Sequence, residues 1–207
     1  MLKPGSKFRI LSGNYCKTRP NMTYKTYRIF TMLALTLLST RAIYAWDHEV
    51  SLGYGWGKEI SEDYQNRAFV LSGKFYKFPK IDNTLIATID GSVSRLHADT
   101  DQHQNLTTGA VALGLRAYFA DPDVHQVRPY LGVSSGPAYI SDQWFGNREQ
   151  GANFDIQTTL EGGVEFQLKH NRSIDVNLHM VHYCNAGLAS PNQGFDVPYV
   201  LSIGYQF

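Results

Sequence analysis

Hydrophobic and polar residues alternate in eight separate segments of the chain. In segment 50–56, for example, every second residue is Val, Leu, Tyr or Trp, and the residues between them are serine or glycine. Side chains of a strand point alternately to its two faces, so each segment predicts a strand with one apolar face and one small or polar face. The eight segments are 50–56, 69–75, 85–93, 111–119, 130–140, 154–166, 172–184 and 199–207.

An even number of such segments, separated by polar turns and carrying aromatic residues near their ends, is typical of an outer-membrane barrel. A closed sheet leaves no strand edge unpaired, which is the condition for strands to cross a lipid bilayer. We therefore expect an all-β fold: an eight-stranded antiparallel transmembrane β-barrel whose interior is filled by side chains. The final Phe207 resembles the terminal aromatic signal of bacterial barrels. A soluble eight-stranded barrel or sandwich, with the same alternation facing a core, is the alternative.

The first 45 residues differ from the rest in charge and hydropathy. They contain eight of the nineteen Lys and Arg residues and no Asp or Glu, and the apolar run 29–38 precedes a small residue, Ala45. That order is typical of a secretory signal peptide, and the run is shorter than the roughly 20 residues of a spanning helix. We expect cleavage after Ala45, leaving 46–207 as the barrel. Translation from Met22 and an uncleaved anchor helix are the alternatives.

The expected mature chain is acidic and has a single cysteine. Residues 46–207 carry 11 basic and 18 acidic residues, a net charge of −7, which argues against nucleic acid as a partner. Cys16 lies in the leader, so Cys184 has no partner for an internal disulfide. A lone exported cysteine is either a reactive thiol or a small apolar residue.

The most distinctive chemistry lies at the end of segment 172–184. His182 and Cys184 continue the apolar side of this strand, which contacts lipid if the chain is a membrane barrel. With both chain ends periplasmic, this end of the strand lies at the outer leaflet. An imidazole beside a thiol is a base and a nucleophile, and their orientation suggests a lipid as substrate. Zinc binding with Asp196 lacks a fourth ligand, and we expect neither a metal nor a diffusible cofactor.

The sequence His-Tyr-Cys-Asn-Ala-Gly-Leu at 182–188, followed by Pro-Asn-Gln-Gly-Phe-Asp at 191–196, resembles the signature of the lipid A 3-O-deacylase (PagL) family. Members of that family are eight-stranded outer-membrane barrels, in which a His-x-Ser-Asn-Ala-Gly strand and the following loop form a Ser/His/Glu triad on the lipid-facing wall. Two positions depart from the pattern. Cys184 stands where the family has serine, and Asp196 stands where it has glutamate.

The resemblance implies a catalytic role for three residues. His182 would be the general base, Cys184 the nucleophile and Asp196 the group that orients the imidazole. Asp is one methylene shorter than Glu, so its carboxylate must approach the ring more closely, and a misplacement of about 1 Å can cost about 100-fold in rate.

Three neighbouring residues would support this chemistry. Asn192 matches the family position proposed to stabilise the oxyanion, and Gly187 would offer a backbone N–H to the same oxygen. We assign Asn185 to shaping the turn. Of the other polar and aromatic candidates, we expect Trp144 and Phe145 to contact lipid headgroups from an outer loop.

Together these features indicate a bacterial outer-membrane carboxylic ester hydrolase that removes the 3-linked hydroxyacyl chain of lipid A. Its partners would be lipid A in the outer leaflet and the membrane itself, and a homodimer is left open. Because of the two departures at Cys184 and Asp196, a catalytically silent family member is one alternative. A structural or adhesion barrel that binds partners through its outer loops, including loop 97–105, is the other.

Overall fold

A computed structural model describes residues 47–76, 84–120 and 126–207, so the predicted signal peptide at 1–45 lies outside the described residues. The described chain forms ten strands, of which eight are long. The long strands are β1 (Asp47–Lys58), β2 (Gln65–Tyr76), β3 (Leu85–Ala98), β4 (Asn105–Tyr118), β5 (Val127–Ile140), β8 (Phe154–Gln167), β9 (Ser173–Cys184) and β10 (Phe195–Gln206).

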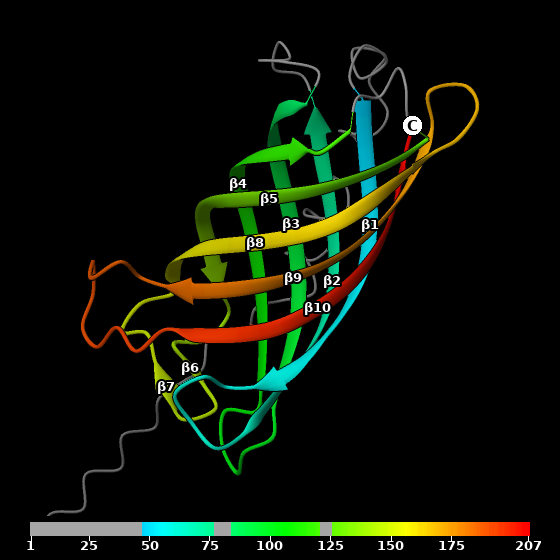
Figure 1. The fold of residues 1–207 in the computed structure, drawn as a ribbon. Coiled ribbons are helices and arrows are strands. Elements are labelled where there is room, and N and C mark those ends of the chain that lie inside the picture. Colours follow the sequence, from blue (N-terminus) through cyan, green and yellow to red (C-terminus); the bar gives the residue numbers. More distant parts are fainter. Residues whose placement is uncertain (1–46, 77–83, 121–125) are drawn as a thin grey trace, which may run out of the picture. The chain divides into compact units, whose positions relative to one another are not determined.

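These eight strands close into a single antiparallel barrel. Their order around the wall is β1, β10, β9, β8, β5, β4, β3 and β2, so each strand is paired on both sides (Figure 1). The structure therefore confirms the eight-stranded antiparallel barrel predicted from the alternation. Within the described ranges, no helix is long and apolar enough to cross a membrane.

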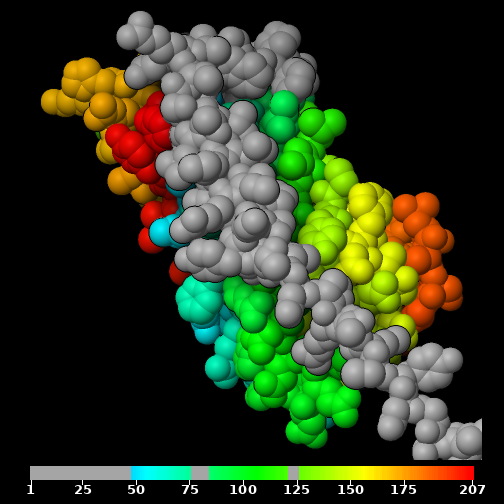
Figure 2. Space-filling view, turned by 180° about the vertical axis from the view of Figure 1, so that it is seen from behind, coloured from blue at the N-terminus to red at the C-terminus, as the bar shows by residue number. Residues whose placement is uncertain are grey.

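Apolar side chains cover the outside of this barrel and charged side chains fill part of the inside. Leu52 and Leu113 are 68% and 67% exposed, whereas Arg116 and Asp175 are each 1% exposed. Seen from behind, the side chains of β4, β5 and β8 lie next to one another on the outer surface (Figure 2). This arrangement inverts that of a soluble protein and suits a lipid surround.

Ion pairs occupy the interior near the end of the barrel where the chain terminates. Arg116 lies 3.3 Å from Glu49, 3.3 Å from Glu161 and 3.4 Å from Asp175. The ammonium of Lys74 lies 2.6 Å from the Glu161 carboxylate. Charges inside a protein are stable only when paired and hydrogen-bonded, and this network meets that condition.

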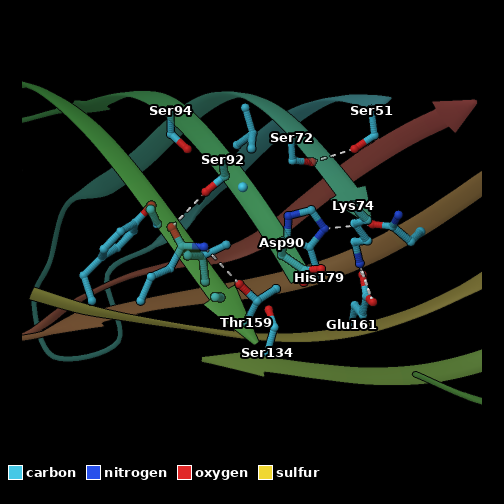
Figure 3. A pocket seen from close by; sticks show the side chains of 18 residues that line it. Ser51, Ser72, Lys74, Asp90, Ser92, Ser94, Ser134, Thr159, Glu161 and His179 are labelled. Atoms are coloured by element: carbon cyan, nitrogen blue, oxygen red, sulfur yellow. Dashed lines mark hydrogen bonds and ion pairs between the residues drawn. The ribbon is translucent and has the colours of Figure 1, made fainter. Parts of the chain in front are cut away.

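A small polar cavity of about 40 Å³ lies beside these ion pairs, inside the barrel. Figure 3 shows its wall, where Ser51 and Ser72 share a 2.6 Å hydrogen bond and His179 faces the Lys74–Glu161 pair. A cavity of this size has room for a few water molecules at most. The interior is therefore filled, as predicted, and it lies on the opposite side of the wall from His182.

The other end of the barrel carries the connections 59–64, 99–104, 141–153 and 185–194, and we call it the loop end. A hairpin of two short strands, β6 (Trp144–Phe145) and β7 (Arg148–Glu149), folds over this end. Figure 1 shows the hairpin at the end opposite to the chain terminus, near the connection after β9.

The hairpin corrects one prediction about its aromatic residues. Phe145 is completely buried, with its ring 5.0 Å from that of Phe195, so the prediction that it contacts lipid headgroups is wrong. Trp144 is half-buried and stacks on His103 at 5.3 Å. The hairpin turns inward because the loop end of the interior is apolar and its buried side chains, among them Tyr183, need a cover.

Candidate functional site

The side chains of His182 and Asp196 meet on the outside of the barrel at its loop end. They are direct cross-strand partners of β9 and β10, and the His182 Nδ1 atom lies 2.8 Å from the Asp196 Oδ1 atom. The histidine side chain is 39% exposed and the aspartate side chain 11%. A carboxylate on Nδ1 orients the ring and leaves Nε2 as the nitrogen that can act as a base.

Asp196 faces outward because β10 contains a bulge. Val197 is paired with Val181, but the next pair is Val200 with His179, so two residues of β10 stand opposite one residue of β9. A bulge of this kind shifts the alternation by one residue. Pro198 occupies it, in keeping with the lack of a backbone N–H to donate.

This bulge corrects the predicted start of the last strand. Alternation over 199–207 placed Asp196 in the preceding connection, whereas β10 already begins at Phe195. Without the bulge, residue 196 would share the inward face of Val200 and Ser202. With it, Phe195 and Val197 are buried inside, and Asp196 lies on the same side as His182.

Cys184 is two residues beyond His182 on the same outward face of β9. It is a free, half-buried cysteine, and its cross-strand partner on the neighbouring strand β8 is Ile156. Its side chain is close enough to the His182 imidazole to interact with it electrostatically. The three predicted catalytic residues are therefore brought together on one face, with the imidazole between the carboxylate and the thiol.

The loop backbone at Gly194 packs against the edge of the His182 ring. Gly194 has a φ of +54°, and a Cβ atom at this position would lie 3.2 Å from the His182 Cε1 atom and 3.2 Å from the Tyr183 carbonyl oxygen. Only glycine adopts such a conformation without strain and leaves room for the ring. Arg148 Nε donates to the Gly194 carbonyl at 2.8 Å and so ties the loop to the β6–β7 hairpin.

Asn185 organises the turn that follows Cys184. It is completely buried, and its Nδ2 donates to the carbonyls of Gln150 and Ala189. Its Oδ1 accepts from the N–H of Gly187 at 2.9 Å. This arrangement agrees with the turn-shaping role expected for Asn185, and it engages the N–H expected to face an oxyanion.

Asn192 lies next to this turn, and one of the two polar groups of its side-chain amide is hydrogen-bonded to it. Its Oδ1 accepts from the backbone N–H of Asn185 at 3.0 Å, while the residue as a whole is exposed. The carbonyl side of the amide is thus held by the turn, and the Nδ2 group is the side that can donate to a substrate.

Two residues near the site carry no signal in the sequence pattern. Glu59 and Asn66, which lie just after β1 and at the start of β2, hydrogen-bond to the main chain of Asp196 from inside the barrel. Their sequence distance from Asp196 exceeds 100 residues, so only the closure of the barrel between β1 and β10 reveals the contact. Among the described residues, no group of three or more His, Cys, Asp or Glu side chains is arranged to hold a metal ion.

Comparison with known proteins identifies the family. The family model described as lipid A 3-O-deacylase (PagL) matches residues 34–206. A comparison with curated proteins finds no match.

Two solved structures share the fold. A crystal structure of the outer membrane enzyme PagL has 20% sequence identity and a TM-score of 0.54, covering 77% of this chain and 98% of its own. A crystal structure of Neisserial surface protein A (NspA) has 12% identity and the same TM-score of 0.54, covering 78% of this chain and 95% of its own. At these identities the likeness concerns the fold alone.

The family match covers nearly all of the barrel, including the site on β9 and β10. A closed barrel with an apolar outer band is also one of the two architectures that can span a membrane. The protein is thus a bacterial outer-membrane β-barrel, and it belongs to the lipid A 3-O-deacylase (PagL) family.

Proposed function

We propose that this protein hydrolyses the 3-linked hydroxyacyl ester of lipid A, with Cys184 as the nucleophile, His182 as the general base and Asp196 as the group that orients His182. The observation that carries the proposal is the 2.8 Å contact between His182 and Asp196 on the lipid-facing side of the wall. Cys184 lies beside the imidazole on that face. A lipid can therefore reach the thiol from within the bilayer without entering the barrel.

In the first half of the reaction, Nε2 of His182 takes the proton of the Cys184 thiol, and the sulfur attacks the ester carbonyl carbon. The carbonyl oxygen becomes an oxyanion, and the tetrahedral intermediate collapses as the C–O bond breaks. The sugar oxygen leaves with the proton held by His182. The products are a thioester on Cys184 and a lipid A molecule with a free 3-hydroxyl.

In the second half, His182 takes a proton from water, and the resulting hydroxide attacks the thioester carbonyl. The C–S bond breaks, the thiolate recovers the proton, and a hydroxy fatty acid is released. Asp196 holds the imidazole in the same orientation in both halves and stabilises the imidazolium that forms transiently.

The oxyanion needs hydrogen-bond donors close to Cys184. The Nδ2 group of Asn192 is the side-chain donor that we assign to it, because the carbonyl side of that amide is held by Asn185. The Gly187 N–H donates to Asn185, so it would join only if this side chain released it.

The test is the lipid A of a Gram-negative host that expresses the protein. Mass spectra of lipid A should show the loss of one hydroxyacyl chain with the native chain and no loss with His182→Ala. An unchanged lipid A spectrum, obtained with a correctly folded barrel in the outer membrane, would contradict the proposal.

A further inference from the structure

We propose that Glu59 and Asn66 are positioning residues of the candidate site: from inside the barrel they hold the main chain of Asp196, and thereby keep its carboxylate on His182. This inference rests on the proposed function, since it assigns Asp196 a role in orienting the imidazole.

Three hydrogen bonds connect these residues. The Nδ2 group of Asn66 donates to the Glu59 Oε2 atom at 2.8 Å and to the Asp196 carbonyl oxygen at 2.7 Å. The same Glu59 oxygen accepts from the Asp196 N–H at 3.1 Å. Both polar groups of the Asp196 main chain are thus satisfied by these two side chains.

Such help is needed because regular pairing ends before this point. The last pair between β1 and β10 is Trp56 with Tyr199, so Asp196 has a strand partner only on the β9 side. In an antiparallel sheet, the N–H and C=O of one residue point to the same neighbour. At Asp196 both point away from β9, and without Glu59 and Asn66 they would lack the partners that a continuing strand supplies.

The same geometry brings the catalytic side chains together. When the N–H and C=O groups of two cross-strand partners point away from each other, the partners form a non-hydrogen-bonded pair. The two Cα atoms of such a pair are about 4.5 Å apart, rather than about 5.5 Å. His182 and Asp196 form such a pair. At this spacing the shorter aspartate side chain reaches the imidazole, with His182 Nδ1 and Asp196 Oδ1 2.8 Å apart.

The burial of Glu59 indicates that its hydrogen bonds matter. Glu59 is 1% exposed and Asn66 is fully buried. Burial raises the pKa of the Glu59 carboxyl, and the hydrogen bond from the Asp196 main chain acts in the opposite direction. What the site needs from Glu59 is an oxygen that accepts two hydrogen bonds, and a glutamine amide can supply that oxygen without a charge.

The experiment measures the reactivity of Cys184 rather than turnover. The alkylation rate of Cys184 by iodoacetamide is followed across pH in the folded full-length protein, with mass spectrometry of the Cys184 peptide. The variants are Glu59→Ala, Glu59→Gln and, as the reference for a lost carboxylate, Asp196→Ala. Asp63→Ala is the control, because it removes an exposed carboxylate of the same connection, which forms an ion pair with Lys58.

We expect the pH profile of Glu59→Ala to move from the native profile towards that of Asp196→Ala, while Glu59→Gln and Asp63→Ala keep the native profile. Deacylation of lipid A should fall by roughly 10-fold to 100-fold in Glu59→Ala and recover in Glu59→Gln. A native alkylation profile in folded Glu59→Ala would overturn the inference. If that variant does not fold, Glu59→Asp withdraws the same carboxylate by one methylene and is judged by the same comparison.

The two proposals fail in different ways. If the native chain leaves lipid A unchanged, the proposed hydrolysis is contradicted. The alkylation profiles still report, in that case, whether Glu59 acts on His182 through Asp196. If the native chain hydrolyses lipid A and Glu59→Ala keeps the native alkylation profile, only the positioning role of Glu59 is contradicted.

Discussion

At the scale of single residues, the proposed site combines the thiol of Cys184 with an imidazole and a carboxylate that contact each other at 2.8 Å. A thiol loses its proton more easily than an alcohol, so Cys184 depends less on a strong base than serine would. A thioester is also readily hydrolysed by an activated water. In the proposed mechanism, His182 and Asp196 therefore contribute mainly through their position.

Substitution of Cys184 separates the thiol from the scaffold. Cys184→Ala should abolish release of the hydroxyacyl chain, because no other outward-facing nucleophile accompanies His182 on β9. Cys184→Ser should retain hydrolysis, since serine keeps a nucleophile beside the same imidazole and carboxylate, whose Nδ1 and Oδ1 atoms lie 2.8 Å apart. Both are measured from lipid A mass spectra, and full activity in Cys184→Ala would remove the thiol from the mechanism.

The carboxylate that orients the imidazole can be tested in the same assay. Asp196→Asn keeps the size of the side chain but favours the wrong ring tautomer, so the rate should fall by at least about 100-fold. Asp196→Glu restores the carboxylate of the family and should remain active. A native rate in Asp196→Asn would show that the contact with His182 is structural.

At the scale of elements, the β10 bulge decides whether there is a site at all. It turns Asp196 outward, and it is accommodated by Gly57 of β1. Gly57 has a φ of +144°, and a Cβ atom there would lie 2.9 Å from Cδ of Pro198. The glycine thus provides room for the proline ring that occupies the bulge.

Gly57→Ala should therefore disturb the bulge and lower activity while the barrel still forms. The strain of the backbone conformation alone is about 1–3 kcal/mol, and displacement of Pro198 acts directly on the strand that bears Asp196. Gly91→Ala is the matched control, because its added Cβ would meet no atom within 4 Å. Equal activity of Gly57→Ala and Gly91→Ala in the lipid A assay would show that the bulge is not required for catalysis.

At the scale of the whole molecule, the barrel is stabilised from inside while its chemistry lies outside. The ion pairs around Arg116 lie near the terminal end, and the apolar cluster under the β6–β7 hairpin lies at the loop end. The ion pairs are remote from the site on β9 and β10, whereas the apolar cluster includes Tyr183 and Phe195, which are sequence neighbours of the site residues. Substitutions among the ion pairs should therefore change stability rather than activity.

Lys74→Met tests the contribution of the interior. The substitution leaves Glu161 buried with Arg116 as its remaining cation. Breaking a buried pair costs about 3–5 kcal/mol. Because Arg116 still pairs with Glu161, the decrease in the free energy of unfolding should lie near the lower end of that range. Lys58→Met, which removes an exposed pair, should change it little. Urea unfolding of the protein in lipid vesicles measures the free energy of unfolding of both variants. Equal decreases in Lys74→Met and Lys58→Met would contradict a stabilising interior network.

The sequence predicts the barrel well because each strand must show period two to face lipid on one side and a filled interior on the other. It also predicts that His182 and Cys184 lie on the outward face of β9, since both continue the alternation of that strand. It does not predict the outward turn of Asp196, because one extra residue in a bulge leaves no mark in the hydrophobic pattern beyond Pro198. The burial of Phe145 and the contacts of Glu59 depend on which segments meet after closure.

The central claim is that the Cys184 sulfur attacks the ester, and the most direct measurement is the mass of the Cys184 peptide from protein incubated with lipid A and quenched in acid. We predict a fraction of this peptide that is heavier by one hydroxyacyl group, released by hydroxylamine and absent from His182→Ala. Release of the fatty acid without any acylated Cys184 peptide, together with activity in Cys184→Ala, would contradict the claim.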